Sequence, residues 1–386
     1  MTRSDPKRFT DDAYEAQKSI ALRYRKSITT GLDENLLKRI GGHEGERIFP
    51  LLSHKGIAVY VLDETTRMMT GTFEALVAAV SVTDFKKKGH ATAIFSSGGN
   101  LGTALAAYCE RAGINAFSFN PLVNVPLLDG QWFGNRVQLV AVRDAQRTRD
   151  VMLLARKVLQ KRLGYDPLIP SVQSRMDAMR LRGFAVAEYM RRERILFAAI
   201  AQTISAGFGP LGMFGALADL THKVERLPAF LGVQQEANAY MYRRLKRRAA
   251  RDSSQLIVPT LFDKNPHKTF GTYPMLASLV KNTDGDIVTI NREEFDRYIS
   301  SSVLARLRAH GVVHTKKDGE FVGRSGLMAL VGVLKAIDKS ILCTGPVLVC
   351  MTDGTQKVSQ QPRPWLVAEK DGVIEKILAS LGKVKV

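Results

Sequence analysis

Short apolar segments alternate with longer amphipathic segments along most of this 386-residue chain. The apolar segments have the length of buried strands, and the segments between them are long enough for helices. Because parallel strands need crossovers of about this length, the alternation predicts parallel-rich sheets flanked by helices, an α/β architecture. The predicted strands are GIAVYVL and residues 91–97, 115–121, 136–142, 196–207, 230–236 and 345–354; the predicted helices are 72–88, 101–113, 144–162, 175–193 and a C-terminal one.

The chain is longer than a single hydrophobic core usually supports, since such cores stop growing at roughly 250 to 300 residues. We therefore expect two domains. Residues 1–45 form a polar, mainly helical lead-in, residues 46–85 and 175–386 form the large domain, and residues 86–174 form a smaller inserted α/β domain.

The formal net charge of +19 attracts polyanions and anionic metabolites alike. Its densest segments are residues 241–252, 190–194 and 86–88. No aromatic interleaving, zinc-ligand spacing or recognition-helix pattern accompanies them, which favours a solvated basic face. Nucleic-acid or other polyanion binding through a basic helix at 239–251 stays open as a weaker alternative.

The three cysteines are too few for a disulfide framework, and we expect them to be small core residues in a reducing compartment. The amino terminus lacks an apolar signal region, and no segment is apolar enough to cross a membrane. A cytoplasmic protein without membrane association is expected. The histidines are scattered, and His310 and His314 are interpreted as a helix end turning into a strand, so no metal site is predicted.

The segment SSGGNLG, residues 96–102, joins a predicted strand to a predicted helix. Its glycines allow close backbone approach to a ligand, and the start of the helix offers free N–H groups to a carboxylate or phosphate. Asn100 is expected at the cap position, where it satisfies the helix or reaches the ligand. A capped turn without a ligand is the alternative. The candidate substrate-binding residues here are Ser96, Ser97, Gly98 and Gly99.

A second glycine-rich turn, SAGFGPLG, covers residues 205–212 after a buried strand. It is similar to a phosphate-binding cradle of converging N–H groups. No Gly-Lys-Ser/Thr follows, and Pro210 removes a donor, so neither a P-loop nor a dinucleotide fingerprint is present. The candidate cofactor-binding residues are Ala206, Gly207, Phe208, Gly209 and Gly212.

Two further segments carry candidate residues. In VLVCMTDG, Thr352 follows a strand at the edge where open α/β sheets bind ligands, although a lone threonine is more often structural. In TGTFEALVAAV, Glu74 stands where a strand and loop give way to a helix.

In order and spacing, these four segments resemble fold type II pyridoxal phosphate enzymes, in particular threonine synthase and cysteate synthase. The segments at 232–240, 259–269 and 319–335 strengthen the likeness, which covers roughly residues 45 to 360. It implies a two-domain enzyme with its ligand in a cleft between the domains. Asn100 would contact the cofactor ring, the 205–212 turn would hold the phosphate, and Thr352 would face the pyridine nitrogen.

Position 74 departs from that family, because Glu74 occupies the place of the lysine that forms a Schiff base with the cofactor. A carboxylate cannot condense with an aldehyde. Three alternatives follow: noncovalent binding of pyridoxal phosphate with Glu74 as base, another lysine such as Lys264 taking over, or a pseudoenzyme. Glu74 would also suit a helix start without any catalytic role.

The resemblance implies replacement or elimination at the β or γ carbon of an amino acid or phosphorylated amino acid, in a homodimer. GRSG and TDGTQK differ from the family's usual segments, so substrate preference is not inherited. The alternative from another class is a noncatalytic protein that binds an amino acid or phosphate ligand for regulation or scaffolding.

Overall fold

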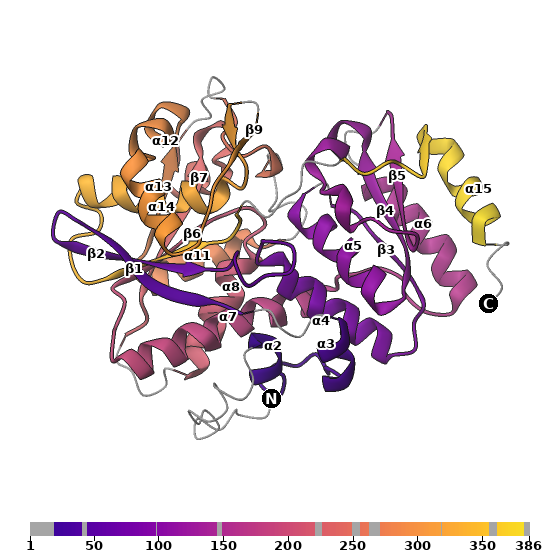
Figure 1. Ribbon diagram of the computed structural model, residues 1–386, viewed down its shortest axis with the longest axis horizontal. Coiled ribbons are helices and arrows are strands. Elements are labelled where there is room, and N and C mark those ends of the chain that lie inside the picture. The colour runs from indigo at the N-terminus through magenta and orange to yellow at the C-terminus, as the bar shows by residue number, and fades with distance from the viewer. Residues whose placement is uncertain are drawn as a thin grey trace. The chain divides into compact units, whose positions relative to one another are not determined.

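The computed structural model describes residues 19–40, 45–97, 99–144, 149–220, 226–248, 255–261, 271–317, 319–354 and 361–381. The chain divides into two compact units (Figure 1). The large unit comprises Met1–Thr29, His43–Phe73 and Met176–Gln356, and the small unit comprises Thr30–Gly42, Glu74–Arg175 and Lys357–Val386. Each has its own sheet flanked by helices, so the predicted α/β class with parallel-rich sheets is confirmed.

In the described part of the chain, the large unit has a six-stranded sheet with the order β1-β2-β11-β6-β7-β8. All neighbouring pairs are parallel except the hairpin of β1 with β2. The strands are β1 (Arg47–His54), β2 (Ile57–Asp63), β6 (Ala199–Thr203), β7 (Ala229–Gln235), β8 (Asp286–Ile290) and β11 (Val347–Met351). The edge strand β1 carries a register shift between Pro50 and Leu52, and Pro50 is exposed.

Helices cover both faces of this sheet, which explains why β6 and β11 are buried at every residue. Two apolar clusters form the core. One cluster lies between the sheet and α12 (Arg292–Tyr298), α13 (Ser301–Ala309) and α14 (Ser325–Asp338). The other lies between the sheet and α7 (Val172–Glu193), α8 (Phe208–Leu220), α9 (Tyr240–Leu245) and α11 (Tyr273–Asn282). The unit also contains α2 (Ile20–Arg23) and the hairpin of β9 (Lys316–Lys317) with β10 (Glu320–Phe321).

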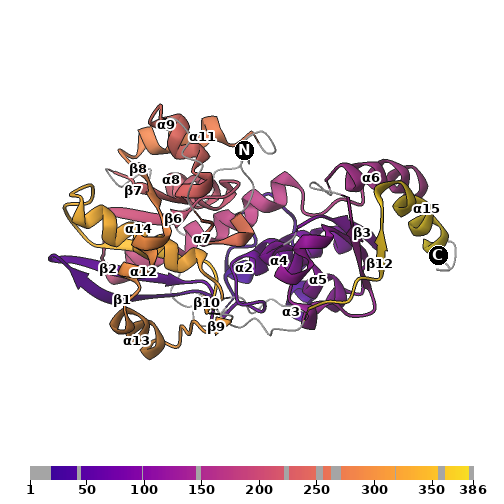
Figure 2. The same cartoon turned by 90° about the horizontal axis from the view of Figure 1, so that it is seen from above.

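The small unit has a parallel sheet with the order β12-β5-β4-β3 in the described residues. Its strands are β3 (Thr92–Phe95), β4 (Asn115–Pro121), β5 (Val137–Val142) and β12 (Leu366–Ala368). Two helices share an apolar cluster with the sheet, α6 (Arg149–Leu163) and α15 (Lys370–Leu381), and Figure 2 shows α15 beside β12. The remaining helices, α3 (Glu34–Ile40), α4 (Glu74–Lys87) and α5 (Asn100–Ala112), pack on one another.

The division differs from the sequence-based boundaries in three places, the first of which is the expected lead-in of residues 1–45, which is divided between the two units. Helix α4 was assigned to the large domain up to residue 85, but it packs on α5 and groups with the small unit. The C-terminal segment was also assigned to the large domain, but β12 pairs with β5 of the small unit. Strand β12 has three residues, which is too short for hydrophobic periodicity to predict that the C-terminal segment joins the sheet of the small unit.

Two local expectations also change. The basic helix predicted for residues 239–251 is the short α9, which ends at Leu245. Its cations have partners within the protein: Arg244 lies 4.1 Å from the Tyr273 ring centroid, and Lys246 forms an ion pair of 2.6 Å with Asp286. No helix in the described ranges is long and apolar enough to cross a membrane.

Candidate functional site

The carboxyl edge of the large sheet brings three separate parts of the sequence together. Met351, the last residue of β11, pairs with Asp63 at the end of β2, and the N–H of Glu64 donates to the Met351 carbonyl at 3.2 Å. Strand β6 pairs with β11 on its other side. Thr352 therefore follows its strand at the same edge at which the glycine-rich turn follows β6, the usual place for a ligand in an open α/β sheet.

The TGTF segment is bonded to this edge through its backbone. The N–H of Phe73 donates to the carbonyl of Thr352 at 3.1 Å, and the N–H of Gly354 donates to the carbonyl of Gly71 at 3.1 Å. Two predicted motifs about 280 residues apart are therefore neighbours. Glu74 follows Phe73 directly and is the first residue of α4. In the described part of the chain, the buried hydroxyl oxygens of Thr70 and Thr72 have no hydrogen-bond partner.

The glycine-rich turn leads into the first turn of α8. Gly207 has a φ of +87°, and Phe208 begins the helix. The first N–H groups of a helix have no partner within it and carry the positive end of the macrodipole, so this segment suits an anion. A Cβ at position 209 would lie 2.1 Å from Nε2 of the buried Gln202, whose Oε1 has no partner among the described residues. A glycine at 209 therefore leaves room for Gln202 beside the turn.

The other two residues predicted for this turn have structural surroundings. The Ala206 carbonyl accepts a hydrogen bond of 2.6 Å from the Thr272 hydroxyl. A Cβ at Gly212 would lie 2.4 Å from the Cβ of Met179, so close packing of α8 on α7 is enough to explain that glycine.

Replacing Gly207 by alanine should lower the free energy of unfolding more than replacing Gly271. Both glycines have positive φ, +87° and +66°, so both variants incur left-handed strain of about 1–2 kcal/mol. At Gly207 the new Cβ also meets Leu276 Cδ1 at 2.4 Å, whereas at Gly271 it meets nothing within 4 Å. This overpacking adds about 1–3 kcal/mol. Urea unfolding of the two variants measures the difference, and equal losses would contradict the crowded turn.

Beyond Thr352, the edge is closed by the start of α14. The Thr352 and Ser325 hydroxyls lie 3.4 Å apart, and the Thr203 hydroxyl donates to the Ser325 carbonyl at 2.6 Å. The Asp353 carboxylate accepts from the N–H groups of Ser325 at 3.3 Å and Gly326 at 2.9 Å. A carboxylate at a helix N-terminus is favourable, so Asp353 fixes α14 against the end of β11. The sequence predicted only Thr352 from this group.

His314 is another buried residue near this edge, and its sequence context does not predict a functional role. It follows α13, is 8% exposed, and has no partner for either ring nitrogen within the described residues. Burial lowers the pKa of His314, although Asp353 and Asp63 beside it oppose that shift. A neutral imidazole has one nitrogen that donates a hydrogen bond and one that accepts, so this ring can serve as either at the edge. Its spacing from His310 gave no signal of this, since only the fold places it beside Asp353.

A buried ion pair supports the same edge. Arg182 of α7 and Glu64 after β2 form a two-point contact, with Nη2 and Oε2 2.7 Å apart, and both side chains are at most 1% exposed. The guanidinium lies 4.8 Å from the Phe73 ring centroid. Arg182 therefore connects α7 to the TGTF segment, while Glu64 neutralises its charge.

The asparagine turn lies in the small unit, and its geometry corrects one expectation. Asn100 is the first residue of α5 and is buried, whereas Gly99 is the N-cap, without a side-chain cap. A Cβ at Gly102 would lie 2.0 Å from the Ser97 carbonyl oxygen, so the turn folds closely onto the helix. Ser96, Ser97 and Gly99 are half-buried, and Gly98 lies outside the described residues.

Lys264, the alternative lysine, also lies outside the described residues. Within the described ranges, no group of three or more His, Cys, Asp or Glu side chains is placed to hold a metal ion.

Comparison with known proteins identifies what this architecture resembles. Solved structures that share the fold include three that are each less than 20% identical to this chain. Threonine deaminase isoform 2 from Solanum lycopersicum is 13% identical with a TM-score of 0.54, covering 91% of this chain and 92% of that chain. O-ureido-L-serine synthase with O-ureido-L-serine bound is 18% identical with a TM-score of 0.54, covering 92% and 100%. A hydrogen sulfide-producing enzyme with a bound α-aminoacrylate intermediate is 14% identical with a TM-score of 0.59, covering 84% and 90%.

No curated protein sequence matches the chain significantly. A family model described as "Pyridoxal-phosphate dependent enzyme" matches residues 41–353. Because that match covers most of the sequence, the chain belongs to the pyridoxal-phosphate dependent enzyme family, whose cofactor is pyridoxal phosphate.

Proposed function

We propose that this protein binds pyridoxal phosphate at the carboxyl edge of the large sheet, without a lysine link, and acts on an amino acid. The convergence of TGTF, the glycine-rich turn and Thr352 at one edge carries the proposal. The N–H groups around Gly207 and Gly209 would hold the phosphate, with Phe208 at the helix start, and the Thr352 hydroxyl would meet the ring nitrogen.

The residues at this edge fit a noncovalently held cofactor. The buried hydroxyls of Thr70 and Thr72 and the Gln202 Oε1 have no partner among the described residues, and a buried polar atom left unpaired costs about 1–3 kcal/mol. A polar ligand at the edge would satisfy such atoms. Glu74 at the Schiff-base position does not fit a covalent link, because a carboxylate forms no bond of that kind with an aldehyde.

When bound, pyridoxal phosphate acts as an electron sink for the α-carbon of an amino acid. The contribution of this chain is to orient that cofactor and to move protons. Glu74, one residue from the Phe73 backbone contact with Thr352, is the proposed base. His314, buried beside Asp353, is a second group able to accept or donate a proton at this edge.

The finer assignment rests on the sequence motifs. By likeness to threonine synthase and cysteate synthase, we propose β- or γ-replacement or elimination on an amino acid or phosphorylated amino acid in a homodimer. Ser96, Ser97, Gly98 and Gly99 would receive the substrate carboxylate, and Asn100 would contact the cofactor.

Absorption spectroscopy with two variants tests the proposal. Titration with pyridoxal phosphate should give a saturable change in the visible spectrum of the wild type. Thr352→Val should weaken binding by about tenfold, the value of one hydrogen bond, whereas Thr289→Val on β8 should leave it unchanged. Adding an amino acid should change the spectrum again, and Glu74→Gln should abolish turnover while keeping cofactor binding.

Borohydride reduction followed by peptide mapping separates the alternatives. No labelled lysine is expected. A label on Lys264 would show that the cofactor is linked covalently to that lysine, and noncovalent binding would then be wrong. If pyridoxal phosphate produces no spectral change with or without amino acids, the proposed function is wrong and a noncatalytic ligand-binding role takes its place.

A further inference from the structure

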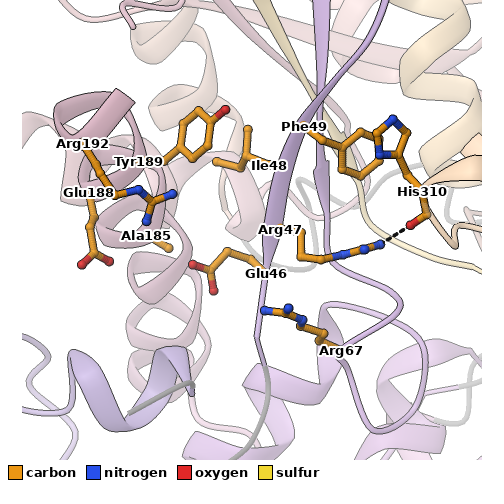
Figure 3. Close-up of a pocket in the computed structure, with 10 residues that line it drawn as sticks. All are labelled: Glu46, Arg47, Ile48, Phe49, Arg67, Ala185, Glu188, Tyr189, Arg192 and His310. Carbon is orange, nitrogen blue, oxygen red and sulfur yellow. Dashed lines mark hydrogen bonds between the residues drawn. The ribbon is translucent and has the colours of Figure 1, made fainter. Parts of the chain in front are cut away.

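A cavity of about 260 Å³ opens in the large unit away from the motifs discussed above. Figure 3 shows its lining residues, which come from the start of β1, the loop after β2, helix α7 and the end of α13. None of the residues that we propose for the cofactor or its substrate lines this cavity. It is therefore a separate place on the same unit.

Two glutamates, Glu46 and Glu188, line the cavity. Glu46 and Glu188 share one guanidinium: Arg23 Nη2 lies 2.6 Å from Glu46 Oε1 and 3.4 Å from Glu188 Oε2. The hydroxyl of Tyr24 also donates to Glu188. Glu46 is 9% exposed, and its Oε2 has no partner in the described part of the chain. Two carboxylates therefore face one guanidinium, and Oε2 of Glu46 is left without a hydrogen-bond donor among the described residues.

Arginines also line the cavity and supply the opposite charge. Arg67 is exposed and forms no ion pair or side-chain hydrogen bond with the described residues. Arg192 also lines the cavity, with its guanidinium 5.5 Å from the Tyr189 ring centroid. Arg47 does not add a free charge, because it is engaged by Asp63 at 2.7 Å and by the His310 carbonyl. Arg67 is thus the cation available to an incoming anion.

Apolar and aromatic side chains also line the cavity. The rings of Phe49 and His310 are stacked, with centroids 4.0 Å apart and planes inclined by 13°. Tyr189 adds a further ring, and Ile48 and Ala185 add aliphatic surface. Stacked or tilted aromatic contact with a ligand ring would be favourable there.

We propose that this cavity binds an α-amino acid zwitterion with an aromatic side chain, as an accessory site distinct from the cofactor site. The ammonium group would pair with Glu46, the carboxylate with Arg67, and the ring would lie against Ile48 and Tyr189, which pack on the same apolar cluster. A compound without the ammonium group would leave Glu46 unpaired, and a compound without the carboxylate would leave Arg67 unpaired. The site should therefore prefer a zwitterion over either singly charged compound. The proposal stands on the cavity itself and does not depend on the proposed function.

Isothermal titration calorimetry with L-phenylalanine tests the site directly on the protein without added pyridoxal phosphate. We expect saturable binding to the wild type. Phenethylamine lacks the carboxylate and N-acetyl-L-phenylalanine lacks the ammonium charge, and each should bind at least about tenfold more weakly. Arg67→Ala and Glu46→Gln should weaken L-phenylalanine to a similar extent. Arg67 is exposed, so its variant tests the site even if the Glu46 variant proves unstable.

Two controls separate this site from the cofactor site. Arg306→Ala removes an exposed arginine of α13 outside the cavity, and Thr352→Val alters the cofactor edge; both should leave the affinity for L-phenylalanine unchanged. No binding to the wild type would overturn the proposal. An affinity for L-phenylalanine that falls in Thr352→Val but not in Arg67→Ala would also overturn it. Equal binding of L-phenylalanine and N-acetyl-L-phenylalanine would indicate a site for anions in general and would overturn it as well.

Discussion

Replacing Arg182 by methionine should lower the free energy of unfolding by about 3–5 kcal/mol, because it leaves Glu64 buried without a partner. Burial raises the pKa of Glu64, and Arg182 is the opposite charge that opposes this shift. Without the guanidinium, Glu64 must be either desolvated as an anion or protonated. Urea unfolding at neutral pH measures the loss.

Helix α7 offers a matched control two residues earlier. Arg180 forms an ion pair with Asp219, whose side chain is 50% exposed, so solvent screens the interaction and Arg180→Met should cost no more than about 1 kcal/mol. The double variant Arg182→Met, Glu64→Leu should recover most of the loss, since an apolar pair of similar size often replaces a buried ion pair without cost. A single Arg182 variant as stable as the Arg180 variant would contradict this account.

Arg23→Met should produce a loss of similar size, about 3–5 kcal/mol at neutral pH, with a distinctive pH dependence. Its side chain is 4% exposed and is the cation shared by Glu46 and Glu188. Burial raises the folded-state pKa of Glu46, and Arg23 opposes that shift, so the variant raises the pKa further. A carboxyl with a raised folded pKa binds more protons when folded. The contribution of Glu46 to the free energy of unfolding is therefore complete below the pKa that this carboxyl has in the unfolded chain. It is lost as the pH rises through the pKa that the carboxyl has in the folded protein.

The deficit of Arg23→Met relative to the wild type should therefore shrink in acid and grow toward neutral pH. Urea unfolding at a series of pH values measures this slope. Lys26→Met, at an exposed position three residues along the chain, should show neither the loss nor the slope. A deficit that is the same at every pH would mean that lost packing of the arginine side chain, not the two carboxylates, accounts for it.

The sequence predicts the strands of the sheet centres well because both of their faces are buried. Strands such as β6 and β11 read as continuous apolar runs, which periodicity and length identify as buried strands. Strands β8 and β12 were missed: the Asp286 end of β8 reads as part of a polar loop, and β12 spans three residues. Such strands form because they pair with a neighbouring strand, and their own composition does not indicate a strand.

The site shows the same contrast. The ordered motifs led to Thr352 and the glycine-rich turn, because each carries a local chemical reason for its residues. Arg182 and Glu64 are 118 residues apart, and Arg182 lies in a basic helix that reads as a solvated surface. The pKa of His314 is likewise lowered only by the residues that enclose it. Pairing between distant charges is set by the tertiary fold, so single-sequence reasoning has no signal for it.

The edge strand β1 has a consequence for how this protein behaves at high concentration. An outer strand exposes unpaired backbone groups that can template pairing with another molecule. Pro50 lacks an N–H to offer, and the irregularity between Pro50 and Leu52 disturbs the straight ladder that a second strand would need. This hairpin therefore protects the chain against self-association through its sheet, a property that replacing Pro50 by valine should weaken.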